Sequence, residues 1–207
     1  MRNLLLKTLF FAQVAIQATA YAQEWNGPFG VEMGLTEEQL RKKIPELKKV
    51  TDFSFVFTTA PKHFPGTSFY IALISKKSGL CSISAHLTVK SSVFGDAVRE
   101  KFSFIQSSLT DKYGTPTRSF DFLRNGSLWT DPEDWMIGLI KKERILASFW
   151  TKPEDPSGKT SLPSTLNGIA LEATAERISA ADITIGYEFA NFATCSEELK
   201  KSRTDVL

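Results

Sequence analysis

Hydrophobic residues recur at every second position in several stretches of the chain, which is the period of a β-strand with one buried face. The clearest stretch is residues 79–90, where apolar positions alternate with serine, histidine, threonine and lysine. Its apolar positions are Cys81, Ile83, Ala85, Leu87 and Val89. Shorter runs of the same kind predict further strands over residues 51–59, 68–76, 119–124, 135–142, 144–152, 168–178 and 182–192.

Two segments have the spacing of three to four residues that is typical of helices. In residues 34–45, Thr36 and Gln39 are placed to form a capping box, and Pro45 ends the segment. Residues 94–113 carry one stripe of apolar side chains and are followed by Gly114, which suits the end of a helix. We therefore expect one short and one long helix.

The order of these elements is a short helix, three strands, a long helix and five strands. It predicts an α+β fold in which a mostly antiparallel β-sheet has the short and the long helix packed on one face. Residues 153–167 hold three prolines and few apolar residues, so we expect them to form a mobile loop that contributes nothing to the core.

The first 22 residues have the pattern of a secretory signal peptide. Arg2 and Lys7 precede or flank an apolar run, and small residues at 18, 20 and 22 favour cleavage after Ala22. Residues 23–207 are then a single domain that is periplasmic or secreted. No later apolar stretch approaches the length of about 20 residues that a membrane-spanning helix needs.

Charge argues against two classes of partner. Removing residues 1–22 takes away two basic residues and no acidic one, which leaves equal numbers of each in the mature chain. A neutral chain without a lysine or arginine block is unsuited to nucleic acid or to an anionic lipid surface.

The two cysteines, Cys81 and Cys195, have one obvious use in an exported chain. Oxidising compartments permit disulfides, and an even count leaves no thiol over. The alternative, a redox site, needs an exposed thiol of low pKa, usually in a Cys-x-x-Cys pair, and neither residue has such a neighbour. We expect a Cys81–Cys195 disulfide.

Candidate chemistry is sparse, and we expect no cofactor and no metal site. The PSGKTS segment at 156–161 lacks the first glycine of a phosphate-binding loop. His63 has the sequence context of a turn. His86 lies between Ser84 and other polar residues on a strand face, where it could act as a base but is more simply a surface residue.

Acidic and aromatic residues gather at 129–135. Rigid aromatic side chains beside carboxylates are common at recognition surfaces, so we predict a binding site for a protein or a sugar here. A purely structural alternative is a polar turn whose tryptophans pack inward. A second alternative is a pair of catalytic carboxylates. The candidate binding residues are Trp129, Asp131, Glu133, Asp134 and Trp135.

Two short motifs resemble those of a known group of proteins. Residues 34–40, GLTEEQL, look like the Gly-Met-Thr helix start of small Gram-negative envelope modules, among them the outer-membrane assembly lipoproteins and the β-lactamase inhibitor proteins. Residues 113–116, YGTP, followed by a strand region with Trp129, are similar to their Leu-Gly-x-Pro continuation. The resemblance implies a non-enzymatic module that binds another protein in the bacterial envelope.

These observations favour an exported, non-enzymatic protein that binds a protein partner of unknown identity in the cell envelope. An inhibitor or immunity protein and a structural envelope component are two versions of this hypothesis. The alternative is an envelope hydrolase that uses the acidic-aromatic segment at 129–135. It predicts that at least two of Asp131, Glu133, Asp134 and His86 converge in a concave site.

Overall fold

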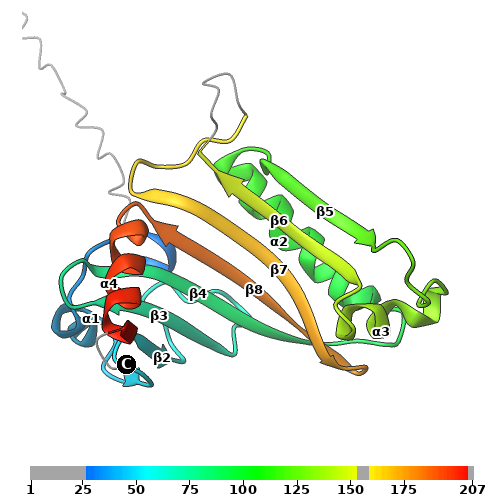
Figure 1. Ribbon diagram of the computed structural model, residues 1–207, viewed down its shortest axis with the longest axis horizontal. Helices are drawn as coiled ribbons and strands as arrows, with labels where there is room; N and C mark the ends of the chain where they lie inside the picture. The colour runs from blue at the N-terminus through cyan, green and yellow to red at the C-terminus, as the bar shows by residue number, and fades with distance from the viewer. Residues whose placement is uncertain (1–26, 153–158, 205–207) are drawn as a thin grey trace, which may run out of the picture.

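A computed structural model describes residues 27–152 and 159–204 of the chain, and it confirms the α+β fold with an antiparallel sheet. Figure 1 shows one curved, eight-stranded sheet with helices on both sides. The strands are β1 (Lys48–Lys49), β2 (Ser54–Phe57), β3 (Phe69–Ser75), β4 (Gly79–Lys90), β5 (Arg118–Leu123), β6 (Arg144–Thr151), β7 (Leu166–Arg177) and β8 (Ala180–Phe189). The α-helices are α1 (Glu37–Lys43), α2 (Asp96–Tyr113), α3 (Trp135–Ile140) and α4 (Phe192–Thr204), and η1 (Pro28–Gly30) and η2 (Pro132–Asp134) are 3₁₀ turns.

The sheet is built from two meanders that meet at their last strands. Its order is β1-β2-β3-β4-β8-β7-β6-β5, and neighbouring strands are antiparallel throughout. Each meander follows a helix, α1 in the first half of the chain and α2 in the second. The pairing of β4 with β8 therefore joins the two halves, with Ala85 opposite Ile185 near its middle.

The helices α1 and α2 pack on the same face of the sheet, as predicted. Thr36 caps α1 and forms the expected capping box with Gln39. The apolar stripe of α2 is buried, although this helix begins only after Gly95 and leaves Phe94 exposed. The buried side chains of both helices belong to one core cluster with Ile83, Leu87, Ile183 and other residues of this sheet face.

The prediction of a strand over residues 135–142 is wrong, because this segment forms α3. Pro132 opens η2 at a position where its missing N–H costs no hydrogen bond, and α3 continues from it. Trp135 and Leu139, four residues apart, are then buried on one side of the helix. A short apolar run has no periodicity that separates a strand from a buried helix, and here the fold favours the helix.

The predicted disulfide between Cys81 and Cys195 is confirmed, and it ties α4 to the sheet. Cys81 lies at an irregularity of the β3–β4 pairing, between Leu80 opposite Ile74 and Ser82 opposite Leu73. Cys195 belongs to α4, a helix of 13 residues. Figure 1 shows α4 in front of the strands and α2 behind them.

Hydrogen bonds add to the attachment of α4. The Glu198 carboxylate accepts hydrogen bonds from the hydroxyls of Ser75 and Ser78, which hold the pKa of Glu198 below its usual value. Asn191 donates to the carbonyl oxygens of Ser78 and Leu80, at 2.8 and 3.1 Å.

Part of the predicted loop at 153–167 is packed, contrary to the expectation that none of it meets the core. Thr160 is buried and its hydroxyl donates to the Thr115 carbonyl oxygen at 2.6 Å. Leu162 packs against the core cluster, and β7 already begins at Leu166. Residues 153–158, like the predicted signal peptide at 1–22, lie outside the described residues. Within the described ranges, no helix has the length and apolar character that crossing a membrane requires.

Candidate functional site

The predicted binding residues at 129–135 divide into buried and exposed ones. Trp135 is 5% exposed and belongs to the core. The guanidinium groups of Arg99 and Arg144 each lie 5.6 Å from the centre of its ring. Asp131 and Glu133 are exposed, whereas Trp129 and Asp134 are half-buried. Trp135 is therefore part of the packed core, and the acidic side chains belong to the residues that directly precede α3.

The carboxylates of this segment do not converge with His86. Trp135 packs beside Gly95 at the start of α2, and the Met136 N–H donates to the Val93 carbonyl oxygen at 3.1 Å. The segment is therefore attached on the α2 side. His86 projects from the opposite face of β4, where its neighbours are Phe69 and Thr184. Among the described residues, no hydrogen bond or ion pair links His86 to Asp131, Glu133 or Asp134, so His86 is not part of an acidic site with this segment.

The feature that the structure adds is the sheet face opposite α2, which we call the open face. Cross-strand pairing places side chains from six strands in continuous rows on it. One row runs Phe69, His86, Thr184, Glu172, Ala147 and Phe120, from β3 to β5. The next row runs Ile71, Ser84, Gly186, Ala170, Phe149 and Arg118. Of the α-helices in the described ranges, α4 packs on β3 and β4 from the side of the open face. The helices α1, α2 and α3 lie on the other side of the sheet.

His86 is the centre of a neutral hydrogen-bond network on the open face. Its Nε2 lies 2.9 Å from the Ser84 hydroxyl, and its Nδ1 lies 3.2 Å from the Thr184 hydroxyl. The ring stacks on Phe69 with centroids 4.7 Å apart. Burial lowers the pKa of His86 below its ordinary value, and the charge of Asp182 opposes this shift. The imidazole is therefore predominantly neutral at pH 7.

The Ser84–His86 contact lacks the further parts of a nucleophilic site. The Nδ1 side of His86 meets a hydroxyl group where a catalytic histidine is usually oriented by a carboxylate. Ser84 lies within the regular pairing of β4 with β3 and β8, so its backbone belongs to the ladder and not to a strained turn. The network is suited to recognition by hydrogen bonds.

Negative charge occupies the middle of the open face. Glu172 on β7 and Asp182 and Glu188 on β8 project from it, and none of the three forms an ion pair within the described residues. Asp182 accepts a hydrogen bond from the Thr88 hydroxyl at 2.7 Å. A hollow of about 400 Å³ on this face is lined by Asp182 of the three, together with Phe69, His86 and other side chains of β4, β7 and β8 that include Glu176 and Arg177.

Aromatic side chains occupy the β5–β6 end of the open face. The ring of Phe120 lies 6.1 Å from the rings of both Phe122 and Phe149, in edge-to-face geometry. Phe122 is 45% exposed, and at the other end of the face Phe69 is 36% exposed. The open face thus has an acidic centre between two aromatic borders.

Sequence reasoning found the alternation that creates this face but missed the face itself. A period of two tells which residues of one strand share a side, and it says nothing about which strands are neighbours. His86 and Glu172 come together only because β8 lies between β4 and β7.

The described residues contain no cluster of three or more histidine, cysteine, aspartate or glutamate side chains that could hold a metal ion. Comparison of the chain with protein-family models, with curated proteins and with solved structures found no match.

Proposed function

We propose that the protein is exported and binds another protein through the open face, without catalysing a reaction. The open face carries this proposal because it combines exposed aromatic side chains with carboxylates that have no ion-pair partner within the described part of the chain. Residues of these types are common where proteins meet, and here one rigid sheet presents them together.

Export is supported by two independent features. Residues 1–22 have the composition of a secretory signal. The Cys81–Cys195 disulfide joins residues 114 positions apart, and such bonds persist in oxidising compartments. The resemblance of residues 34–40 and 113–116 to Gram-negative envelope modules supports a location in the periplasm or outside such a cell.

The chemistry of the open face specifies the partner. Glu172, Asp182 and Glu188 require a partner surface with lysine or arginine side chains, because a buried carboxylate without a counter-charge is costly. Phe120 and Phe122 require apolar groups about two strands away from those cations, since neighbouring strands are about 4.8 Å apart. We therefore propose a protein partner whose binding surface has a basic patch beside an apolar one.

Two open-face variants and one matched control test this proposal. Ala170→Arg places a bulky cation opposite Gly186, which has no side chain, and Glu172→Lys reverses a central charge. Ser107→Arg adds the same charge as Ala170→Arg on an exposed position of α2, which lies across the sheet. Each chain is purified, checked by its melting temperature and used to capture partners from envelope extracts with a crosslinker.

The expected result is one protein that is captured by the wild type and by Ser107→Arg and lost with both open-face variants. Loss in all three variants, or in none, would contradict a role for the open face. Hydrolysis of an envelope substrate by the wild type, abolished by Asp131→Asn or Glu133→Gln, would replace this proposal with the hydrolase alternative.

A further inference from the structure

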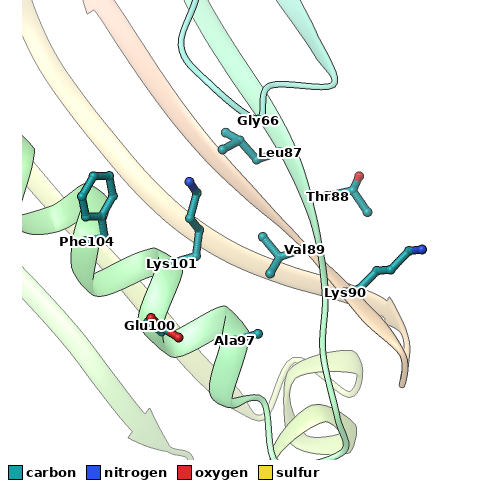
Figure 2. Close-up of a pocket in the computed structure, with 9 residues that line it drawn as sticks. All are labelled: Gly66, Leu87, Thr88, Val89, Lys90, Ala97, Glu100, Lys101 and Phe104. Carbon is teal, nitrogen blue, oxygen red and sulfur yellow. The ribbon is translucent and has the colours of Figure 1, made fainter.

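A groove of about 570 Å³ lies between the end of β4 and α2, on the side of the sheet away from the open face. Figure 2 shows Leu87 and Val89 pointing from β4 toward α2, whereas Thr88 and Lys90 point the other way. The opposite wall is formed by Ala97, Glu100, Lys101 and Phe104 of α2, and Gly66 closes one end.

One wall of the groove is a strand edge without a neighbour. β3 begins at Phe69, which pairs with His86, so the last four residues of β4, Leu87 to Lys90, extend beyond it. These four residues still pair with β8 on their other side, from Leu87 opposite Ile183 to Lys90 opposite Ala180. At about 3.3 Å per residue, the free edge is about 13 Å long.

The backbone groups of Thr88 and Lys90 face this free edge. The Ser68 N–H donates to the His86 carbonyl oxygen at 2.8 Å, so the polar backbone groups of His86 point toward β3. The Ser91 N–H donates to the Ser179 carbonyl oxygen at 3.0 Å, so those of Ser91 point toward β8. Alternate residues of an antiparallel strand share a direction, and Thr88 and Lys90 therefore follow His86.

These backbone groups of Thr88 and Lys90 have almost no hydrogen-bond partner within the described residues. The Thr88 N–H makes one long contact, 3.4 Å, with the Ser68 hydroxyl. Beyond it, a strand laid beside β4 would find the Thr88 carbonyl oxygen and both backbone groups of Lys90 as partners.

Two cations border the groove. The Lys101 ammonium lies 5.9 Å from the centre of the Phe64 ring and 5.5 Å from that of Phe104, which holds it above the groove. Lys90 stands at the other end of the free edge. Neither lysine forms an ion pair within the residues that the structure describes, and Glu100 is the one acidic side chain lining the groove.

We propose that this groove binds an extended segment of a partner protein, which adds to β4 as a short strand in line with β3. Backbone hydrogen bonds to Thr88 and Lys90 would hold the segment, and its alternate side chains would enter the apolar space between Leu87, Val89 and Phe104. The unpaired ammonium of Lys101 above the groove calls for an acidic side chain or a terminal carboxylate beside the apolar ones. The site is independent of the proposed open-face function, because it lies across the sheet and uses the backbone of Thr88, whose side chain points to the open face.

The test uses a displayed library of random nine-residue peptides as the probe and the purified full chain as the bait. Peptides that the library enriches are synthesised, and their affinities are measured by fluorescence anisotropy. Three variants of the bait separate the parts of the site: Lys90→Pro, Lys90→Gln and Ala97→Trp.

Lys90→Pro removes the N–H on the free edge and spares the hydrogen bonds to β8, a position at which a strand tolerates proline. Lys90→Gln removes the same charge and keeps the N–H, so it is the matched control. Ala97→Trp fills the groove from α2. Unchanged melting temperatures show that the variants are folded.

We expect enriched peptides to combine alternating apolar residues with an aspartate or glutamate. Their affinity should fall at least tenfold with Lys90→Pro and Ala97→Trp, and less than threefold with Lys90→Gln. The open-face variant Ala170→Arg should bind them like the wild type, which distinguishes failure at this groove from failure of the open-face proposal.

Three results would overturn the proposal. The library could enrich no peptide, or the affinities could be the same for Lys90→Pro and Lys90→Gln. A dimer of this chain that Lys90→Pro dissociates would identify a second copy as the occupant.

Discussion

Removing the disulfide should cost this fold a large part of its stability. The bond joins Cys81 on β4 to Cys195 on α4, and both residues are fully buried. It closes a loop across 114 sequence positions, and the chain-entropy relation for such a loop gives about 4.8 kcal/mol at 25 °C. Strain and residual structure in the unfolded chain usually reduce this gain, so we expect a loss of about 3–5 kcal/mol.

The measurement is urea unfolding of the oxidised wild type and of a Cys81→Ala/Cys195→Ala double variant. With a slope of about 2–3 kcal/mol per molar urea for a domain of this size, the midpoint should fall by about 1–2.5 M. The double variant also loses two buried sulfur atoms. The wild type kept reduced throughout the titration separates this packing effect from the cross-link.

Loss of the cross-link should act first on α4. Hydrogen bonds of Glu198 in α4 and of Asn191 just before it, with Ser75, Ser78 and Leu80, still contribute to the attachment of this helix. Amide hydrogens of α4 should then exchange well before those of β4 and β8. A difference of less than about 1 kcal/mol between the oxidised and reduced wild type would refute the cross-link argument, because it would show that the long loop costs the unfolded chain little.

Two further predictions concern packing and pH. Gly95→Ala should destabilise the fold by at least about 2 kcal/mol, because a Cβ there would overlap the Trp135 ring and the residue has a φ of +69°. The control Gly126→Ala has a φ of +82° and open space around its Cβ, and should cost only about 1 kcal/mol. Equal losses of the two variants in urea unfolding would contradict the packing explanation. Burial lowers the pKa of His86 in the folded chain, so on acidification the unfolded chain binds a proton at this residue first. The free energy of unfolding should therefore fall as the pH drops from about 6.5 to the lower pKa of the folded state. A His86→Gln variant should show a smaller decrease between pH 7.5 and 5, and an NMR titration of His86 that gives a pKa above 6.5 would reverse the argument.

The sequence predicted best the elements that several local rules support. The strand over residues 79–90 has the bounds of β4, because its alternation is long and uninterrupted. The capping box of Thr36 and Gln39 is present at the start of α1, since both residues act within one turn. In contrast, the strand predicted over 135–142 is helical, and no local rule predicted α4. Both misjudged segments take their structure from distant partners: α3 from α2 and β7, and α4 from Cys81 and Ser75.

The candidate site was less accessible to sequence reasoning. The burial of Trp135 depends on the space left by Gly95, which is 40 positions away and shows no local sign of the contact. The open face depends on β8 lying between β4 and β7, and the groove depends on β3 ending short of β4. These are properties of strand order and relative length, which the pattern of a single strand does not contain.

The meeting of two meanders at β4 and β8 has a consequence for how the chain folds. Every other pairing in the sheet joins strands that follow one another along the chain, so it closes only a short connection. The β4–β8 pairing, from Ser82 opposite Glu188 to Lys90 opposite Ala180, is the single long closure, and slow folding is associated with contacts of this kind. Cys81 directly precedes this pairing and Cys195 follows it by a few residues. In an unfolded chain that keeps its disulfide, the two strands of this pairing are already held close together. The conformational entropy of the long closure is therefore lost before folding begins, and only the hairpins on either side remain to form.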